Sequence, residues 1–73
     1  MSYADTIYAR LSQEYPEAEI EVIDPDGVHL TLKMKEKSFS SLTKMQQHRA
    51  IYKALGDVFA QGLHALEIHS SAS

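Results

Sequence analysis

The 73-residue chain contains no cysteine and no tryptophan, and it has only three glycines and two prolines. Without cysteine there is no disulfide framework, no thiolate metal site and no cysteine nucleophile. The glycines form no phosphate-binding, dinucleotide-binding or GxxG pattern, and no Gly-x-Ser-x-Gly turn marks a hydrolase nucleophile. These absences leave no recognisable catalytic motif, and we predict no catalytic residues.

Long apolar segments are also missing. No run approaches the length of a transmembrane helix, and the N-terminal MSYADTIYARLSQEY has an early acid and no apolar stretch of a signal peptide. We therefore expect a cytoplasmic protein that does not enter a membrane.

Charge is distributed unevenly along the chain, with a net charge of −3 that argues against tight, nonspecific nucleic-acid binding. Before His29, Arg10 is the only base among several acids. After His29 the bases predominate, and they are Lys33, Lys35, Lys37, Lys44, Arg49 and Lys53. This basic middle indicates either solvated faces or a real basic patch, and the sequence leaves both interpretations open.

The first half of the chain predicts a helix followed by a β-hairpin. Apolar residues recur at helical spacing over about residues 3–14, and Pro16 ends that helix. The segment EIEVI, residues 19–23, predicts a strand that runs into the tight turn 24–27. In the next strand, VHLTLKMK, the alternate residues Val28, Leu30, Leu32 and Met34 share one face, and His29, Thr31, Lys33 and Lys35 share the other.

The second half predicts a polar connection, a long helix and a third strand. Thr43 and Gln46 have the spacing of a capping box at the start of the helix. An apolar stripe flanked by Ile51 and Val58 is predicted at Met45, His48, Tyr52, Leu55 and Phe59, and Gly62 is placed for the C′ position. LHALEI, residues 63–68, predicts the last strand, and residues 70–73 a frayed tail.

These elements predict one α+β domain over residues 1–73, an αββααβ sandwich. The helices cover one face of a three-stranded mixed sheet, and the other face is open to water. The connection between the second and third strands passes through a helix, so these two strands are expected to be parallel.

The histidines are the candidates for chemistry, because imidazole binds metals and accepts protons near neutral pH. His48 lies on the apolar stripe, where a half-buried structural role with a hydrogen bond to a carbonyl or carboxylate is favoured. His64 shares the parity of Leu66 and Ile68, whereas His69 lies on the opposite parity and is expected to be an ordinary exposed residue. Taken alone, a histidine in a strand favours simple exposure.

The spacing of several residues resembles the BolA family. Phe39 is followed nine residues later by the pair His48-Arg49, then by Tyr52 and Leu55, and the strand contains an HAL motif at His64, Ala65 and Leu66. His29 matches the family's His-Phe step, with Leu30 in place of Phe. The resemblance covers residues 19–68, and it departs from the family at Ser41, where a glycine is common, and in lacking the C-terminal extension with its Trp.

The resemblance implies a class II KH-like fold and a role as an adaptor in iron–sulfur metabolism. Family members pair with monothiol glutaredoxins, and the pair shares a [2Fe–2S] cluster. The isolated chain is expected to be a monomer that holds no cluster. The resemblance implies His64 as the constant ligand and His29 as the second ligand. An alternative is a cluster held by His64 with thiolates of the partner and glutathione.

The resemblance also implies a competing function as a DNA-binding transcription regulator. Lys44, Arg49 and Lys53 would then meet phosphates on a helix-turn-helix-like surface, and the same bases would equally suit an acidic glutaredoxin surface. His48, Phe39 and Tyr52 are predicted to be structural. A third alternative is a domain with an unrelated protein partner.

Overall fold

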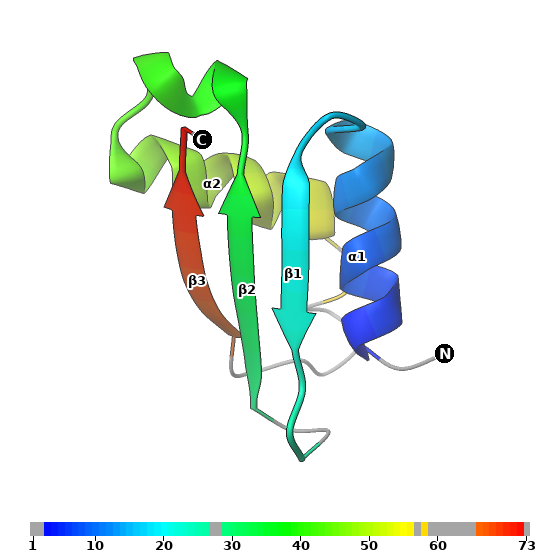
Figure 1. Ribbon diagram of the computed structural model, residues 1–73. Coiled ribbons are helices and arrows are strands. Elements are labelled where there is room, and N and C mark those ends of the chain that lie inside the picture. Colours follow the sequence, from blue (N-terminus) through cyan, green and yellow to red (C-terminus); the bar gives the residue numbers. More distant parts are fainter. Residues whose placement is uncertain (1–2, 27–28, 57, 59–65, 73) are drawn as a thin grey trace.

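The described part of the chain forms a three-stranded sheet with two α-helices packed on one face (Figure 1). The computed structural model describes residues 3–26, 29–56, 58 and 66–72. The elements follow in the order α1 (Tyr3–Glu14), β1 (Glu19–Ile23), β2 (Leu30–Lys35), η1 (Lys37–Ser41, a 3₁₀-helix), α2 (Lys44–Leu55) and β3 (Leu66–Ser71). This confirms the predicted α+β class.

Helix α1 has the predicted bounds, and its buried side is formed by Ile7 and Leu11, one helical turn apart. The chain leaves the helix at Tyr15, whose N–H donates to the Leu11 carbonyl at 2.8 Å, and turns at Pro16. Proline disfavours helical geometry at the preceding residue, which explains why the helix stops there.

The sheet has the strand order β1-β2-β3 and is mixed. Strands β1 and β2 pair antiparallel, with Val22 opposite Leu32, and β2 pairs with β3 in parallel, with Leu32 opposite Ile68. Both predicted pairings are confirmed. Strand β2 begins at Leu30, two residues after its predicted start, and residues 27 and 28 of the predicted turn and strand start lie outside the described residues.

The prediction for the end of the chain is wrong in two respects. The third strand is Leu66–Ser71, three residues later than the predicted end at Ile68, and residues 70 and 71 are strand and not a frayed tail. Ser70 is buried, and the Ser71 carbonyl accepts a hydrogen bond from the Glu36 N–H at 3.0 Å. The strand continues because β2 extends to Lys35 and offers a partner as far as Ser71.

Helix α2 begins as predicted, with a complete capping box between Thr43 and Gln46. It ends earlier than predicted, because Gly56 is its C-cap, and the predicted C′ residue Gly62 lies outside the described residues. No helix of the described part of the chain is long and apolar enough to span a bilayer.

The buried face of α2 agrees with the predicted stripe only in part: Leu55 of the stripe and the flanking Ile51 are buried, but other members are not. Gln47, Ile51 and Leu55 are buried, whereas Met45 is 66% exposed and Tyr52 is 43% exposed. Both faces have the 3.6-residue period, so periodicity alone does not decide between them. The orientation of the helix is set by its packing on the sheet.

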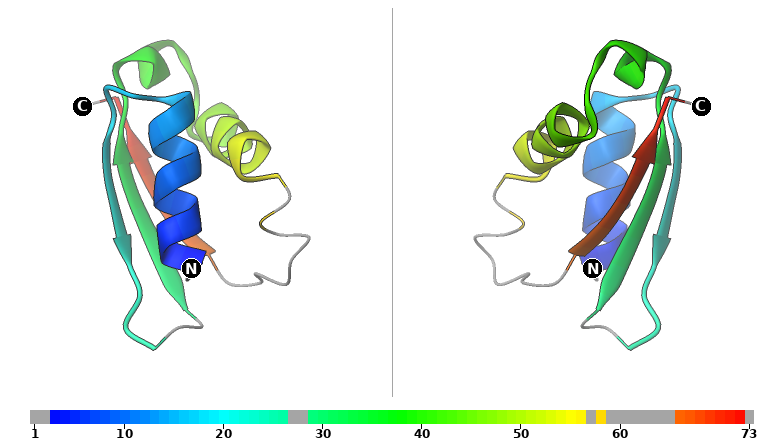
Figure 2. Two further views of the ribbon diagram at one scale, coloured as in Figure 1. Left: turned by 90° about the vertical axis from the view of Figure 1, so that its right-hand side faces the viewer. Right: turned by 90° about the vertical axis from the view of Figure 1, so that its left-hand side faces the viewer.

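The core lies between the sheet and the two helices, and Figure 2 shows in edge view that α1 and α2 lie on the same side of the sheet. The fully buried side chains come from every layer and are Ile7, Leu11, Leu32, Met34, Phe39, Ile51, Leu55 and Val58. On β2 the burial alternates, with Leu30, Leu32 and Met34 inside. The opposite sheet face is left open to water, as predicted.

Candidate functional site

The strands β2 and β3 begin beside each other at one end of the sheet. Leu30, the first residue of β2, is the register partner of Leu66, the first residue of β3. His29 directly precedes Leu30, and His64 lies two positions before Leu66 in the sequence. His64, the main predicted ligand, lies outside the described residues, as does Ala65 of the HAL motif.

His29 is exposed, as predicted from its parity, and it is held by Asp26. The Asp26 Oδ1 accepts the His29 backbone N–H at 2.8 Å, and Oδ2 lies 2.8 Å from the ring Nδ1. An ionised carboxylate only accepts hydrogen bonds, so the proton of this contact belongs to Nδ1. The neutral ring then has its lone pair on Nε2, in a side chain that is 73% exposed.

This arrangement is common among metal-binding histidines, which donate their second ring N–H to a carboxylate. The carboxylate fixes both the tautomer and the direction of the ring. Among the described residues, however, no three His, Cys, Asp or Glu side chains come together as a metal site. The geometry therefore suits a ligand that completes a site shared with other groups.

The predicted surface residues of α2 divide into two kinds. Arg49 and Lys53, one turn apart, are exposed, and their role at a partner or nucleic-acid surface stays a prediction. Lys44 is exposed as well, but its ammonium donates to the Ser70 carbonyl and so ties the start of α2 to β3. Met45 and Tyr52 are also exposed on this helix, so the surface of α2 is both basic and apolar.

The residues predicted to be structural have different outcomes. Phe39 is buried, and its ring packs edge to face on Tyr15 with centroids 5.5 Å apart. His48 is half-buried, as predicted, and its hydrogen bond to a carbonyl or carboxylate stays a prediction. Tyr52 is exposed, so its predicted place on the apolar stripe is wrong.

A buried polar hub around Gln47 was not predicted. Its Nε2 donates to the carbonyls of Phe39 and Leu42, each at 3.2 Å, and its Oε1 accepts the Ser70 hydroxyl at 2.7 Å. Gln47 therefore links η1, α2 and β3 with all its amide groups engaged. The sequence contained one indication of this hub. Gln47 precedes Ile51 by four residues, so it lies on the same apolar face of the helix.

The basic middle of the chain does not form one patch. Lys33 and Lys35 lie on the open sheet face, whereas Arg49 and Lys53 belong to α2 on the opposite side of the sheet. The separation follows from the fold, because the helices cover only one sheet face. The interpretation of separate solvated faces is therefore favoured over a single patch.

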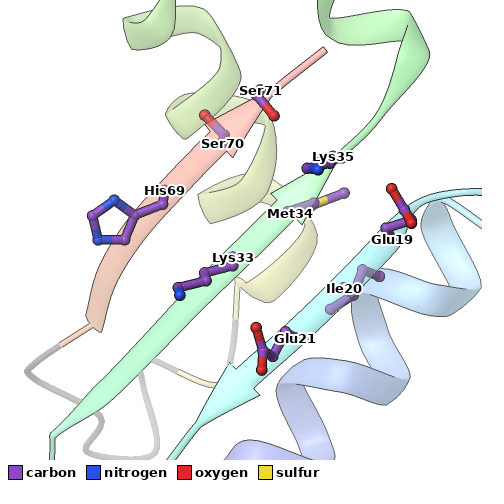
Figure 3. A pocket seen from close by; sticks show the side chains of 9 residues that line it. All are labelled: Glu19, Ile20, Glu21, Lys33, Met34, Lys35, His69, Ser70 and Ser71. Carbon is purple, nitrogen blue, oxygen red and sulfur yellow. The ribbon is translucent and has the colours of Figure 1, made fainter. Parts of the chain in front are cut away.

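The open sheet face carries a shallow groove between rows of charge (Figure 3). Glu19 and Glu21 on β1 lie opposite Lys35 and Lys33 on β2. His69 on β3 is exposed, as predicted, and its Nε2 lies 3.5 Å from a Glu67 carboxylate oxygen. Acid and base alternate across the strands, so this face offers no concentrated charge of one sign.

Comparisons with known proteins give a consistent family. The family model described as BolA-like protein matches residues 7–73. Over 50 residues, 68% of this chain, the sequence is 40% identical to the UV-induced protein uvi31 of Schizosaccharomyces pombe. The match covers 49% of that protein, so the chain spans about half the length of this curated relative.

Solved structures show the same fold. BolA1 from Arabidopsis thaliana superposes with a TM-score of 0.86 at 27% identity, and the match covers 97% of this chain and 92% of that one. The BolA domain of SufE1 from the same plant gives a TM-score of 0.85 at 29% identity, with the same coverage of both chains.

Proposed function

Because this chain belongs to the BolA family, we propose that it is a non-enzymatic adaptor that binds a monothiol glutaredoxin and helps to hold or transfer a [2Fe–2S] cluster. The cluster is cargo shared by the two proteins. This chain has no cysteine, so it contributes imidazole nitrogen, and the thiolates come from the partner and glutathione. The presence of a BolA domain in SufE1 supports a role related to iron–sulfur clusters.

The observation that carries the proposal is the contact between Asp26 and His29. The carboxylate accepts from both the backbone N–H and Nδ1 of His29, which orients the ring and leaves Nε2 as the available donor atom. A surface histidine needs no such orientation for solubility or packing. It does need it to bind iron in a defined direction.

The assignment of His64 as the constant ligand rests on the HAL motif and on the register of the sheet. Leu30 and Leu66 are partners in the parallel pairing, so the chain segments that carry His29 and His64 join the sheet at the same end. Both histidines are thus attached within two residues of adjacent strand starts. This supports a pair of imidazole ligands contributed by one end of the sheet.

The exposed side of α2 is our candidate for the partner surface. Arg49 and Lys53 supply positive charge, and Met45 and Tyr52 supply apolar area. Protein interfaces are enriched in Arg, Tyr and Met, and complementary charge steers association. An acidic glutaredoxin surface fits this composition.

DNA binding remains the competing function, supported by the exposed bases Arg49 and Lys53. It has less support, because Lys44 is engaged with Ser70 and the bases of β2 lie on the other side of the sheet. With two phosphate contacts, the logarithm of the DNA-binding constant would fall against the logarithm of the salt concentration with a slope of only about −1.8. Binding of that kind is weak at physiological salt.

The test is co-expression with a monothiol glutaredoxin, followed by the elution volume and the visible absorption spectrum of the complex. His64→Ala and His29→Ala are compared with the control His69→Ala. This control removes an exposed histidine of β3 that lies three residues beyond Leu66, away from the end of the sheet where the proposed ligands are attached. We expect a heterodimer in every case, a changed spectrum for the first two variants, and an unchanged one for His69→Ala. Absence of any heterodimer refutes the proposal.

A second variant tests the orienting role of Asp26. Asp26→Asn keeps the size of the side chain and removes its charge, so we expect the complex to form and to lose the cluster about tenfold faster. Equal loss rates for Asp26→Asn and the unmodified chain would contradict the role of His29. The competing function is tested by measuring DNA affinity at several salt concentrations for the unmodified chain, Arg49→Ala and Lys53→Ala. If neither added salt nor these substitutions lowers the affinity, DNA binding through α2 is refuted.

A further inference from the structure

The two edges of the sheet differ in whether their backbone is accessible. At the β3 edge, Ser70 is only 4% exposed and its carbonyl accepts from the Lys44 ammonium, so this edge is closed. At the other edge, β1 has β2 as its single neighbouring strand, and Ile20 and Val22 are only half-buried. The β1 edge is therefore the one that another strand can reach.

The hydrogen bonds of β2 determine which backbone groups of β1 face outward. The N–H of Glu36, the residue after β2, donates to the Ser71 carbonyl, so the even-numbered residues of β2 face β3 and the odd-numbered ones face β1. Their register partners on β1 are also odd-numbered, so the backbone groups of Ile20 and Val22 face away from the sheet. Within the described residues, no hydrogen bond satisfies these outward N–H and C=O groups.

The side chains of β1 give the two sides of this edge different chemistry. Glu19 and Glu21 are exposed on the open face, beside the lysines of β2 that are their register partners (Figure 3). Ile20 and Val22 point to the other side of the strand, where they pack against the core. The edge is therefore acidic on the open face and apolar on the helix side.

More apolar surface is exposed around the same edge. Ile23, at the end of β1, is 37% exposed, and Tyr8 of α1 is 52% exposed. In Figure 1, α1 lies beside β1, beyond the edge of the sheet, and Figure 2 shows the helix on the covered side of the sheet. A fourth strand next to β1 would continue the sheet over α1, so its side chains on the helix side would cover apolar area.

We propose that the β1 edge binds an extended segment of another protein in which lysine or arginine alternates with apolar residues. The segment adds antiparallel to β1, with apolar residues opposite Ile20 and Val22 and bases opposite Glu19 and Glu21. The first pairs exchange N–H···O bonds, and the second are non-hydrogen-bonded pairs, in which opposed side chains approach most closely. In strand addition of this kind, backbone bonds supply affinity and alternate side chains supply specificity.

Charge disfavours a second copy of this chain as the occupant. The antiparallel register that uses all of β1 has its axis at Glu21 and opposes this acid to itself, and a register centred on Ile20 places Glu19 opposite Glu21. Like charges directly opposed destabilise a strand pair, and opposite charges stabilise it. The same acids therefore reject self-pairing and select a basic partner.

The probe is a short capped peptide, Gly-Ile-Val-Lys-Val-Lys-Gly, which places a base opposite each glutamate of β1 and valine opposite Ile20 and Val22. It is titrated into the nitrogen-15-labelled chain, and amide signals are followed by NMR. We expect the amides of Ile20 and Val22 to move to lower field, because these amides gain a hydrogen bond, and that of Glu21 to move much less. The small interface predicts a dissociation constant on the order of 1 mM.

Two N-methylated peptides distinguish strand addition from general charge attraction. Methylation of the two valines removes the N–H groups that point at β1, so binding should be lost. Methylation of the two lysines removes N–H groups that point away from β1, so the affinity should stay within about threefold of the unmethylated peptide. Equal binding of the two methylated peptides would refute strand addition.

The charge selection is tested with an acidic peptide that has glutamate in place of lysine and should bind about tenfold more weakly. The double variant Glu19→Gln with Glu21→Gln keeps the side-chain size and should remove this preference. Glu67→Gln, the same substitution at an exposed residue of β3, is the matched control and should preserve it. A preference that persists in the double variant shows that the acids of β1 do not select the partner.

Other outcomes identify other occupants and overturn the proposal. Movement of the Ile20 and Val22 signals when the chain is concentrated without peptide indicates pairing with a second copy. Movement confined to Lys33 and Lys35 indicates binding on the open face, and no movement at about 5 mM peptide leaves the edge to water. None of these results bears on the proposed cluster function, because the β1 edge contains no residue of that site.

Discussion

Replacement of Gln47 by alanine is the sharpest test of how this small domain is held together. The amide of Gln47 bonds the Phe39 and Leu42 carbonyls and the Ser70 hydroxyl, and the side chain is only 5% exposed. The Phe39 carbonyl also accepts the Leu42 N–H at 3.0 Å, so it keeps a partner after the substitution. The groups that lose their partner are the part-buried Leu42 carbonyl and the buried Ser70 hydroxyl.

The expected loss follows from these two groups. A buried polar group without a partner costs about 1–3 kcal/mol, and the Ser70 hydroxyl is free to rotate, which places the total near 3 kcal/mol. A domain of this length has a free energy of unfolding of about 4–11 kcal/mol, so the loss is a large fraction. Each kcal/mol shifts the melting temperature by about 4–8 °C, which predicts a decrease of about 12–24 °C.

The assay is urea unfolding followed by circular dichroism, with Gln13→Ala as the matched control. Gln13 is an exposed glutamine of α1, and its substitution should change the free energy of unfolding by less than about 0.5 kcal/mol. Ser70→Ala and the double variant complete a cycle in which the two losses should not add. If Gln47→Ala is no more destabilising than Gln13→Ala, the hub is not a source of stability.

Three further predictions concern other parts of the fold. Phe39→Ala should lower the free energy of unfolding by about 3–5 kcal/mol in the same assay, whereas Phe39→Leu retains most of the buried volume and should cost much less. Burial, with the carboxylates of Glu14 and Glu36, raises the pKa of Tyr15 above its usual value of 10.0. The folded state therefore holds this proton more tightly than the unfolded state, so stability should fall as the pH rises above 10; Tyr15→Phe should remove that part of the decline in unfolding curves. Thr43→Ala should cost about 1 kcal/mol by loss of the N-cap, and Thr43→Ser should be nearly neutral; equal losses for both would contradict a capping role.

The local elements were predictable where one signal dominated. The bounds of α1 and β1 and the capping box of α2 followed from proline, β-branched residues and the Thr-x-x-Gln spacing. The family followed from the spacing of Phe39, His48-Arg49 and the HAL motif. The assignment of His29 as a ligand stays a prediction, and its contact with Asp26 was not anticipated.

The errors occurred where two faces or two ends had similar local signals. The polar sequence of β3 after Ile68 indicated a tail, but β2 offers backbone partners as far as Ser71, and an interstrand ladder does not depend on side-chain polarity. On helix α2 the predicted stripe is buried at Leu55 and exposed at Met45 and Tyr52, because the buried face is rotated toward Gln47 and Ile51. The Gln47 hub joins three elements that are far apart in the sequence. The only sign of it in the sequence is one polar residue on the apolar face of α2.

The sequence by itself determined the element types, the α+β class and the family, because these depend on local periodicity, turn residues and motif spacing. Only the tertiary structure decided which side of α2 is buried, where β3 ends and how the basic residues are divided between the sheet and the helix. Those features depend on contacts between residues far apart in the chain, such as Ser70 with Gln47 and Lys44. Such contacts form only when the helix packs on the sheet, and no local pattern specifies them.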